Sequence, residues 1–173
     1  QVSCGIGWFR ICTEFADDET FDQELRLKSI RNPMSVYCDP GAIEPDRSDA
    51  NWMIVTEIIP TEDFKAKYPG ISLDGIDPPT DGTGDRLTWL TRDGVRIAEY
   101  WLRKPVKKTI GMTQGGQTLD LSKIGQAMWP MLGITRTRVV DTFEVEQYVI
   151  SGSAVLSGPH KWVSKWIPLI PRS

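Results

Sequence analysis

The chain of 173 residues is long enough to bury one sizeable core, and its 40% hydrophobic and 25% charged residues are ordinary for a globular protein. A formal net charge of −3 counts against a free-standing nucleic-acid binder, which usually carries a basic excess. No apolar run approaches the roughly 20 residues that span a bilayer, and the first residues lack the basic start and apolar core of a signal peptide. We therefore expect no membrane segment and no secretory leader.

The N-terminal third alternates between apolar and polar residues, which predicts strands over residues 7–15 and 21–30. The acidic turn at 17–19 joins them into an antiparallel hairpin, and we expect one of its faces to be wet. Asn32-Pro33 should stop the second strand, because a residue before proline avoids the helical region. A short strand then leads to an Asp-Pro turn.

The next segment predicts an apolar strand, a helix and a long loop. Residues 51–59 form the strand, and Thr61 is expected to cap a short helix that ends before Pro69. Residues 74–85 contain several Gly, Pro and Asp residues and should be a loop. The whole of 1–173 is expected to be a single domain cut from a longer chain, with two lobes possible on either side of the loop at 74–86.

The second half predicts further strands and a second helix. Residues 87–101 form a hairpin around a turn at 92–94, and the strand direction continues through 104–108. Asp120 is expected to cap a helix over 121–128, a long strand covers 136–150, and a last strand covers 166–170. The fold class is therefore α+β, predominantly antiparallel β-sheet with two short helices.

Groups that could support chemistry are few. Cys4, Cys12 and Cys38 lack metal-ligand spacing, so we expect reduced thiols and no metal site. The acidic residues at 17–19, and those between residues 39 and 49, could attract a cation, but turn geometry alone favours aspartate there. His160 lies in a predicted turn at 158–161 and has no nucleophile near it in a recognisable pattern. We expect no cofactor and no catalytic residue.

Basic residues gather in three places and are the candidate contacts to a DNA backbone or a neighbouring subunit. Such side chains can bind phosphates without reading sequence. They can equally form the solvated face of two strands, balanced by nearby acids, and the negative net charge favours this interpretation. The residues are Arg103, Lys104, Lys107, Lys108, Arg136 and Arg138.

One long signature is more specific than any of these groups. Residues 21–39 read FDQELRLKSIRNPMSVYCD, and they are followed by Pro40-Gly41 and then by an acidic loop and a tryptophan-led strand at 49–52. The stretches DFKAKYP at 63–69 and DGVRIAEYW at 93–101 continue the pattern. The chain resembles the portal proteins of short-tailed phages of the P22 type.

The resemblance implies a fold and a function for this chain. It implies a wing-like, β-rich portion of a portal subunit, outside the helices that line the channel. Such subunits form a ring-shaped homo-oligomer through which double-stranded DNA is packaged and ejected without sequence-specific contacts. Terminase, capsid protein and tail adaptor are the implied partners, without a membrane, cofactor or enzymatic activity. The implied location is the virion, and the host bacterial cytoplasm during assembly.

A carbohydrate-binding or hydrolytic β-rich domain with an aromatic cleft is the alternative. Seven tryptophans allow such a cleft, and Glu57 and Glu99 lie on predicted strands as candidate carboxylates. The tryptophans are spread one to an element, which is more typical of core and interface positions. A deep pocket lined by two carboxylates and exposed tryptophan rings would favour the alternative.

Overall fold

The computed structural model describes residues 5–73, 76, 89–91, 94–152 and 154–172. The chain forms two compact units, one made of residues 1–103 with 145–173 and the other of residues 104–144. Most of the predicted loop at 74–86, where a division into lobes was expected, lies outside the described residues, as does most of the turn at 92–94. In the described part of the chain, no helix is long and apolar enough to cross a membrane.

The first unit contains a three-stranded antiparallel sheet in the order β10-β1-β2, which we call sheet A. Its strands are β1 (Gly7–Phe15), β2 (Gln23–Ser29) and β10 (Leu169–Arg172). The predicted hairpin of β1 and β2 is confirmed, with Ile11 opposite Leu27. The last strand lies a few residues beyond its predicted position at 166–170.

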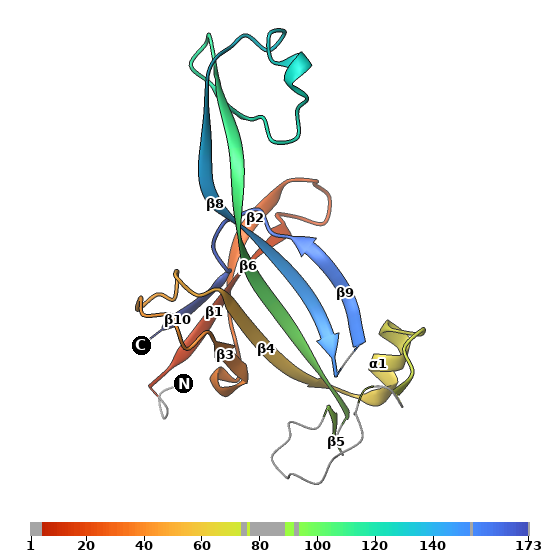
Figure 1. Cartoon of the computed structure of the whole chain (residues 1–173). Helices are drawn as coiled ribbons and strands as arrows, with labels where there is room; N and C mark the ends of the chain where they lie inside the picture. The colour runs from red at the N-terminus through yellow and green to blue at the C-terminus, as the bar shows by residue number, and fades with distance from the viewer. Residues whose placement is uncertain (1–4, 74–75, 77–88, 92–93, 153, 173) are drawn as a thin grey trace. The chain divides into compact units, whose positions relative to one another are not determined.

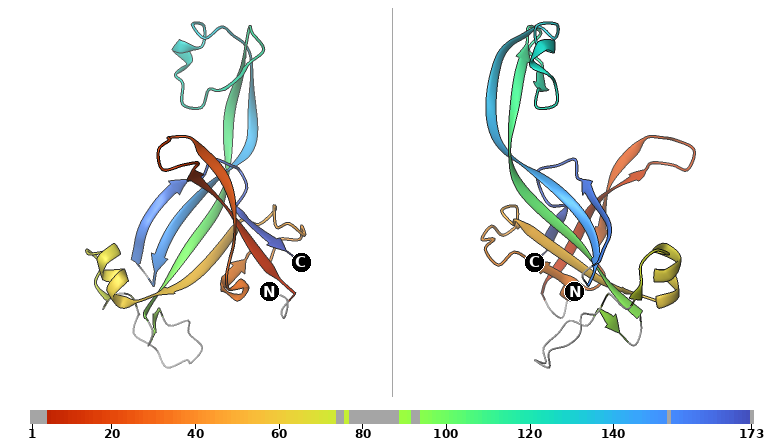
Figure 2. Two further views of the ribbon diagram at one scale, coloured as in Figure 1. Left: turned by 180° about the vertical axis from the view of Figure 1, so that it is seen from behind. Right: turned by 45° about the vertical axis from the view of Figure 1, so that its right-hand side comes forward.

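The prediction of one wet face for this hairpin was wrong, because every residue of β2 is exposed. The two faces differ in chemistry: one carries charged residues, and the other carries Phe15, Leu25 and Leu27. Leu25 and Leu27 are 69% and 68% exposed. The hairpin extends beyond β10 (Figure 2), so its outer part has no second layer in the described chain to cover it. Alternation in sequence separates two faces but does not say which one will be covered.

A larger antiparallel sheet, which we call sheet B, has the strand order β3-β4-β6-β8-β9, with β5 and β7 also paired to β6. Within the first unit, β4, β6, β8 and β9 lie side by side (Figure 1). The strands of sheet B are β3 (Val36–Cys38), β4 (Trp52–Ile59), β5 (Leu90–Thr91), β6 (Gly94–Thr113), β7 (Thr118–Asp120), β8 (Ile134–Ser151) and β9 (Ala154–Lys161).

Strand β9 corrects the prediction of a turn at 158–161. Its pairing with β8 shifts register between Gln147 and Val149 and again before Ile150. Such irregularities break the strict alternation from which a strand is recognised, and Gly158-Pro159 adds a turn-like signal. His160, which was expected at the surface of a turn, is exposed on this strand.

Two hydrophobic clusters hold the first unit together. The larger one joins Trp8, Met53 and Trp101 from both sheets, and the rings of Trp101 and Trp162 meet edge to face at 5.7 Å. The smaller one surrounds Phe64, which is fully buried on helix α1 (Thr61–Lys67). The predicted helix is confirmed, but its N-cap is Pro60, without a side-chain capping bond, and not Thr61.

The second unit contains the outer parts of β6 and β8 together with β7. The predicted helix over 121–128 was wrong, because only a single 3-10 turn, η3 (Gln126–Met128), forms there. The Asp120 carboxylate accepts the backbone N–H of Ser122 at 3.0 Å, which closes a turn in place of a helix cap. Gly125, which disfavours helix, lies in the middle of the predicted range, and Leu121 is buried within the unit.

A candidate binding groove beside strand β4

An open groove of about 600 Å³ lies in the first unit between the β1–β2 hairpin and β4. Its volume falls within the range of small-molecule and cofactor sites. Strands β1, β2, β3, β4 and β6 contribute to it, together with the chain between β2 and β3. The lining residues are Arg10, Lys28, Ser29, Ile30, Arg31, Asn32, Met34, Ser35, Tyr37, Val55, Thr56, Glu57, Ile58 and Arg96.

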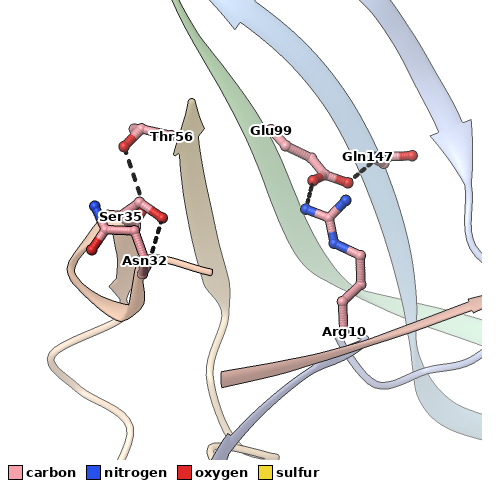
Figure 3. Close-up of polar contacts among 6 residues, drawn as sticks. All are labelled: Arg10, Asn32, Ser35, Thr56, Glu99 and Gln147. Atoms are coloured by element: carbon pink, nitrogen blue, oxygen red, sulfur yellow. Dashed lines mark hydrogen bonds and ion pairs between the residues drawn. The ribbon is translucent and has the colours of Figure 1, made fainter. Parts of the chain in front are cut away.

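The corner at Asn32-Pro33 forms one end of the groove. Asn32 precedes the 3-10 turn η1 (Pro33–Ser35), and its side-chain oxygen accepts the N–H of Met34 at 3.1 Å. The Ser35 hydroxyl donates to the Asn32 carbonyl at 2.7 Å, and the Thr56 hydroxyl donates to the Ser35 carbonyl at 3.3 Å (Figure 3). Proline suits the first position of such a turn, because an N–H at that position would have no partner within the turn and its absence costs nothing. The corner is thereby attached to β4.

This corner leaves part of the β4 edge open. Strand β3 pairs with residues 53–55 of β4, whereas β6 pairs with all of 52–59. The Trp52 carbonyl accepts the N–H of Asp39 on the β3 side. In an antiparallel strand every second residue points both backbone groups to the same side. The N–H and C=O groups of Thr56 and Ile58 therefore point to the β3 side. Because Val36 lies opposite Val55, the Thr56 N–H faces the Ser35 carbonyl at the end of the β3 ladder. The Thr56 C=O and both backbone groups of Ile58 point toward the groove, where no strand of the described chain pairs with them.

A polar chain runs from the groove into the body of the unit. Arg10 forms an ion pair with Glu99, and the Gln147 side-chain amide donates to the same carboxylate (Figure 3). The side chains of Arg10 and Glu99 are 33% and 15% exposed. Burial raises the pKa of Glu99 above its ordinary value, against the opposing effects of Arg10 and Gln147, and the charge of Glu57 adds to the rise. The Arg10 Nε is buried and has no acceptor among the described residues.

Positive charge dominates the groove. Its lining contains four cationic side chains and only Glu57 as an acid. Arg10 is paired with Glu99 and Lys28 with Glu14, whereas Arg31 and Arg96 form no ion pair within the described part of the chain. No local sequence pattern marks this group, because its four cationic side chains come from three separate segments of the chain. The groove can therefore attract an anionic ligand.

The six basic residues identified from sequence do not line the groove. Arg103 is buried in the first unit, where it donates to the Ser48 carbonyl at 2.8 Å and lies over the Trp166 ring at 5.3 Å. In the second unit, Lys107 lies 3.9 Å from Asp141, and Lys108 contacts Asp120 and Glu144. Lys104, Arg136 and Arg138 also belong to the second unit; both arginines are exposed and Lys104 is half-buried.

The aspartates between residues 39 and 49 organise their own loop. Asp39 accepts the backbone N–H groups of Gly41 and Asn51, and Asp49 accepts that of Ile43. These hydrogen bonds hold the pKa values of both aspartates below the ordinary value. The turn interpretation of these carboxylates is confirmed. Among the described residues, no cluster of three or more His, Cys, Asp or Glu side chains could hold a metal ion.

The remaining sequence candidates are dispersed. The His160 ring lies 2.7 Å from the Ser157 hydroxyl on β9, and Cys12 and Cys38 are free thiols, while Cys4 lies outside the described residues. The β4–β6 register places Glu57 and Glu99 on one face of sheet B, but Glu99 is held by Arg10 and Gln147. In the described chain, no tryptophan lines the groove, so nothing here favours an aromatic cleft.

Comparisons with known proteins identify the family of this chain. All of its residues, 1–173, match the model of the family described as phage P22-like portal protein. A relative named "Portal protein", from Acyrthosiphon pisum secondary endosymbiont phage 1, is 27% identical over 184 aligned positions. The alignment covers 96% of this chain, and the chain spans about a quarter of the relative's length.

Proposed function

The chain belongs to the family of phage P22-like portal proteins, and on that premise we propose that it is a β-rich segment of a portal subunit that assembles into a ring. In this proposal the ring is a component of the virion, assembled in the cytoplasm of the host bacterium. Double-stranded DNA passes through it during packaging and ejection. The segment carries no bond chemistry and needs no cofactor.

The exposed apolar face of sheet A supports assembly. Phe15, Leu25 and Leu27 lie on one face of the β1–β2 hairpin, and all three are more than half exposed. Ile170 extends the same face on β10, opposite Phe9. Soluble monomers rarely leave a contiguous apolar sheet face open to water, because covering it lowers the free energy by about 25 cal/mol per Å². A neighbouring subunit is the occupant that the family suggests.

The other partners follow from the family alone. Terminase, capsid protein and tail adaptor would contact outer surfaces of the ring. Arg136 and Arg138 are exposed on β8 and form no ion pair within the described residues, so they are the sequence candidates best placed to meet a phosphate backbone or a neighbouring acidic surface. Arg103 is the least suited, since it is buried.

Negative-stain electron microscopy of the full-length protein tests this proposal. We expect rings with a central channel from the unmodified protein. Leu25→Glu combined with Leu27→Glu should abolish or weaken them, because each substitution buries a charge in an apolar contact. Val163→Glu is the matched control, since Val163 is 86% exposed but lies outside sheet A.

The outcomes separate the family role from the proposed contact face. Rings from both variants would place the subunit contact elsewhere. A full-length protein that stays monomeric or dimeric at every protein and salt concentration would contradict ring assembly itself.

A further inference from the structure

We propose that the groove beside β4 is a docking site for an extended acidic peptide segment of a partner protein, which pairs with the open edge of β4. The proposal does not rest on ring assembly. It rests on two features of the groove that occur together: unpaired strand-forming backbone groups, and an excess of positive charge.

The backbone of β4 supplies the first feature. Ile58 presents its N–H and C=O groups, and Thr56 its C=O group, on the part of the β4 edge that β3 does not cover. An added strand would extend sheet B by main-chain hydrogen bonds, as the antiparallel ladders do elsewhere in that sheet. The Thr56 hydroxyl is already engaged by Ser35, so the backbone is the part of this edge available for pairing. Main-chain pairing of this kind selects an extended chain and excludes a compact ligand.

The surrounding side chains supply the second feature. A strand added to β4 points successive side chains to opposite faces of sheet B. On the core-facing side they would meet Arg10 and Lys28, and on the other side Arg96, whose backbone pairs opposite Ile58. Arg31 is exposed at the rim. Acidic side chains are thus favoured on both faces of the incoming strand.

Apolar groups in the groove refine the ligand. Met34 is 72% exposed and Ile58 44% exposed, and both line the groove beside the basic residues. A purely charged chain would leave these surfaces in contact with water. The predicted ligand is therefore a segment in which acidic and aliphatic residues are interspersed. Duplex DNA lacks both the backbone donors and the aliphatic side chains that such a site recognises.

Fluorescence anisotropy with the full-length protein tests the site. The probe is a labelled eight-residue peptide with blocked ends, in which glutamates alternate with valines. We expect saturable binding that weakens as salt is added. A peptide with lysine in place of each glutamate should not bind. The glutamate peptide with methylated backbone nitrogens keeps its charge but cannot donate to β4, and it should bind at least about tenfold more weakly.

Charge-reversal variants locate the binding. Arg31→Glu and Arg96→Glu should each weaken binding of the glutamate peptide at least about tenfold. Lys123→Glu makes the same change in net charge on an exposed residue of the second unit, and it should leave binding unchanged. Thermal unfolding of each variant establishes that it is folded. Arg31→Gln offers a milder second variant at the exposed rim, for which about threefold weaker binding is expected.

Three results would overturn the proposal. The first is equal binding by the two arginine variants and Lys123→Glu. The second is equal binding by the methylated and unmethylated peptides, since it would show that the β4 edge takes no part. The third is equal competition by DNA. If a short DNA duplex displaces the labelled peptide at the same concentration as the unlabelled peptide does, the groove is a general polyanion-binding surface.

Discussion

Substitutions of Glu99 and of Arg10 should lower the free energy of unfolding by unequal amounts, and the difference between them should depend on pH. Arg10→Leu leaves the Glu99 carboxylate, whose side chain is only 15% exposed, without its cation. Removing one partner of a fully buried pair costs about 3–5 kcal/mol. Arg10 is one-third exposed, so solvent screens part of this effect and we expect about 2 kcal/mol at pH 7. Glu99→Gln removes the buried charge along with the pair and should cost less than about 1 kcal/mol.

The pH dependence follows from the raised pKa of Glu99. A carboxyl whose pKa is higher in the folded than in the unfolded protein stabilises the fold fully below its unfolded pKa. That contribution is lost as pH rises through the folded pKa. The free energy of unfolding of Glu99→Gln, compared with that of the unmodified protein, should therefore increase as pH rises above 4.5. In Arg10→Leu the carboxyl has lost an influence that lowered its pKa, so the deficit should shrink as pH falls toward 4.5 and Glu99 takes up a proton.

Equilibrium unfolding in guanidinium chloride at several pH values measures both effects. Lys28→Leu is the matched control, because it breaks an exposed pair with Glu14 and should change stability little at any pH. Greater destabilisation by Glu99→Gln than by Arg10→Leu at pH 7 would refute the reasoning. So would a difference between Glu99→Gln and the unmodified protein that does not change between pH 4.5 and pH 8.

Three further substitutions test the packing and the loops of the first unit. Phe64→Ala should lower the free energy of unfolding by about 3–5 kcal/mol, measured in guanidinium chloride, because the ring is fully buried; a loss below 1 kcal/mol would contradict its core position. Gly152→Ala should lower the thermal midpoint, since at φ +58° the new Cβ would overlap the Ile76 carbonyl; Gly70→Ala, in open space, should leave it unchanged. The depressed pKa of Asp39 contributes stability that is present above its ordinary value of 3.8 and lost as pH falls through the folded value. Asp39→Asn should therefore be less stable than the unmodified protein at pH 7 and equal to it in strong acid, and equal unfolding midpoints at pH 7 would contradict this.

Sequence periodicity predicted the strands well where a strand is half-buried and regular. Strands β1 and β4 lie close to their predicted positions, because the pleat places alternate residues on a covered face. Strand β8 also lies close to its predicted position, although residues 135–139 are all exposed. The same reasoning failed where the ladder is irregular, as in β9, and where a local polar contact outweighs weak helical spacing, as at Asp120. In both cases the deciding interaction involves one or two residues and leaves no period to detect.

The candidate site was harder to predict than the fold. The contacts predicted from sequence are basic residues that are neighbours along the chain, near 103–108 and 136–138. The groove instead gathers Arg10, Arg31 and Arg96 from segments far apart in sequence. Their proximity depends on the packing of sheet A beside sheet B, and no local pattern encodes it. Arg103 shows the converse, since a residue predicted as a surface contact is buried, lies over the Trp166 ring and donates to the Ser48 carbonyl.

The corner at Asn32-Pro33 connects the family signature with the groove. The motif NPMSVY at 32–37 contains the cap of η1, the proline that begins it, the serine held by Thr56, and the start of β3. If β3 continued past Val36 in register, it would cover the open edge of β4 and fill the groove. The turn prevents this by directing the chain away at Ser35. The stretch that carries the resemblance to portal proteins therefore also creates the open strand edge, and the proposed peptide site depends on it.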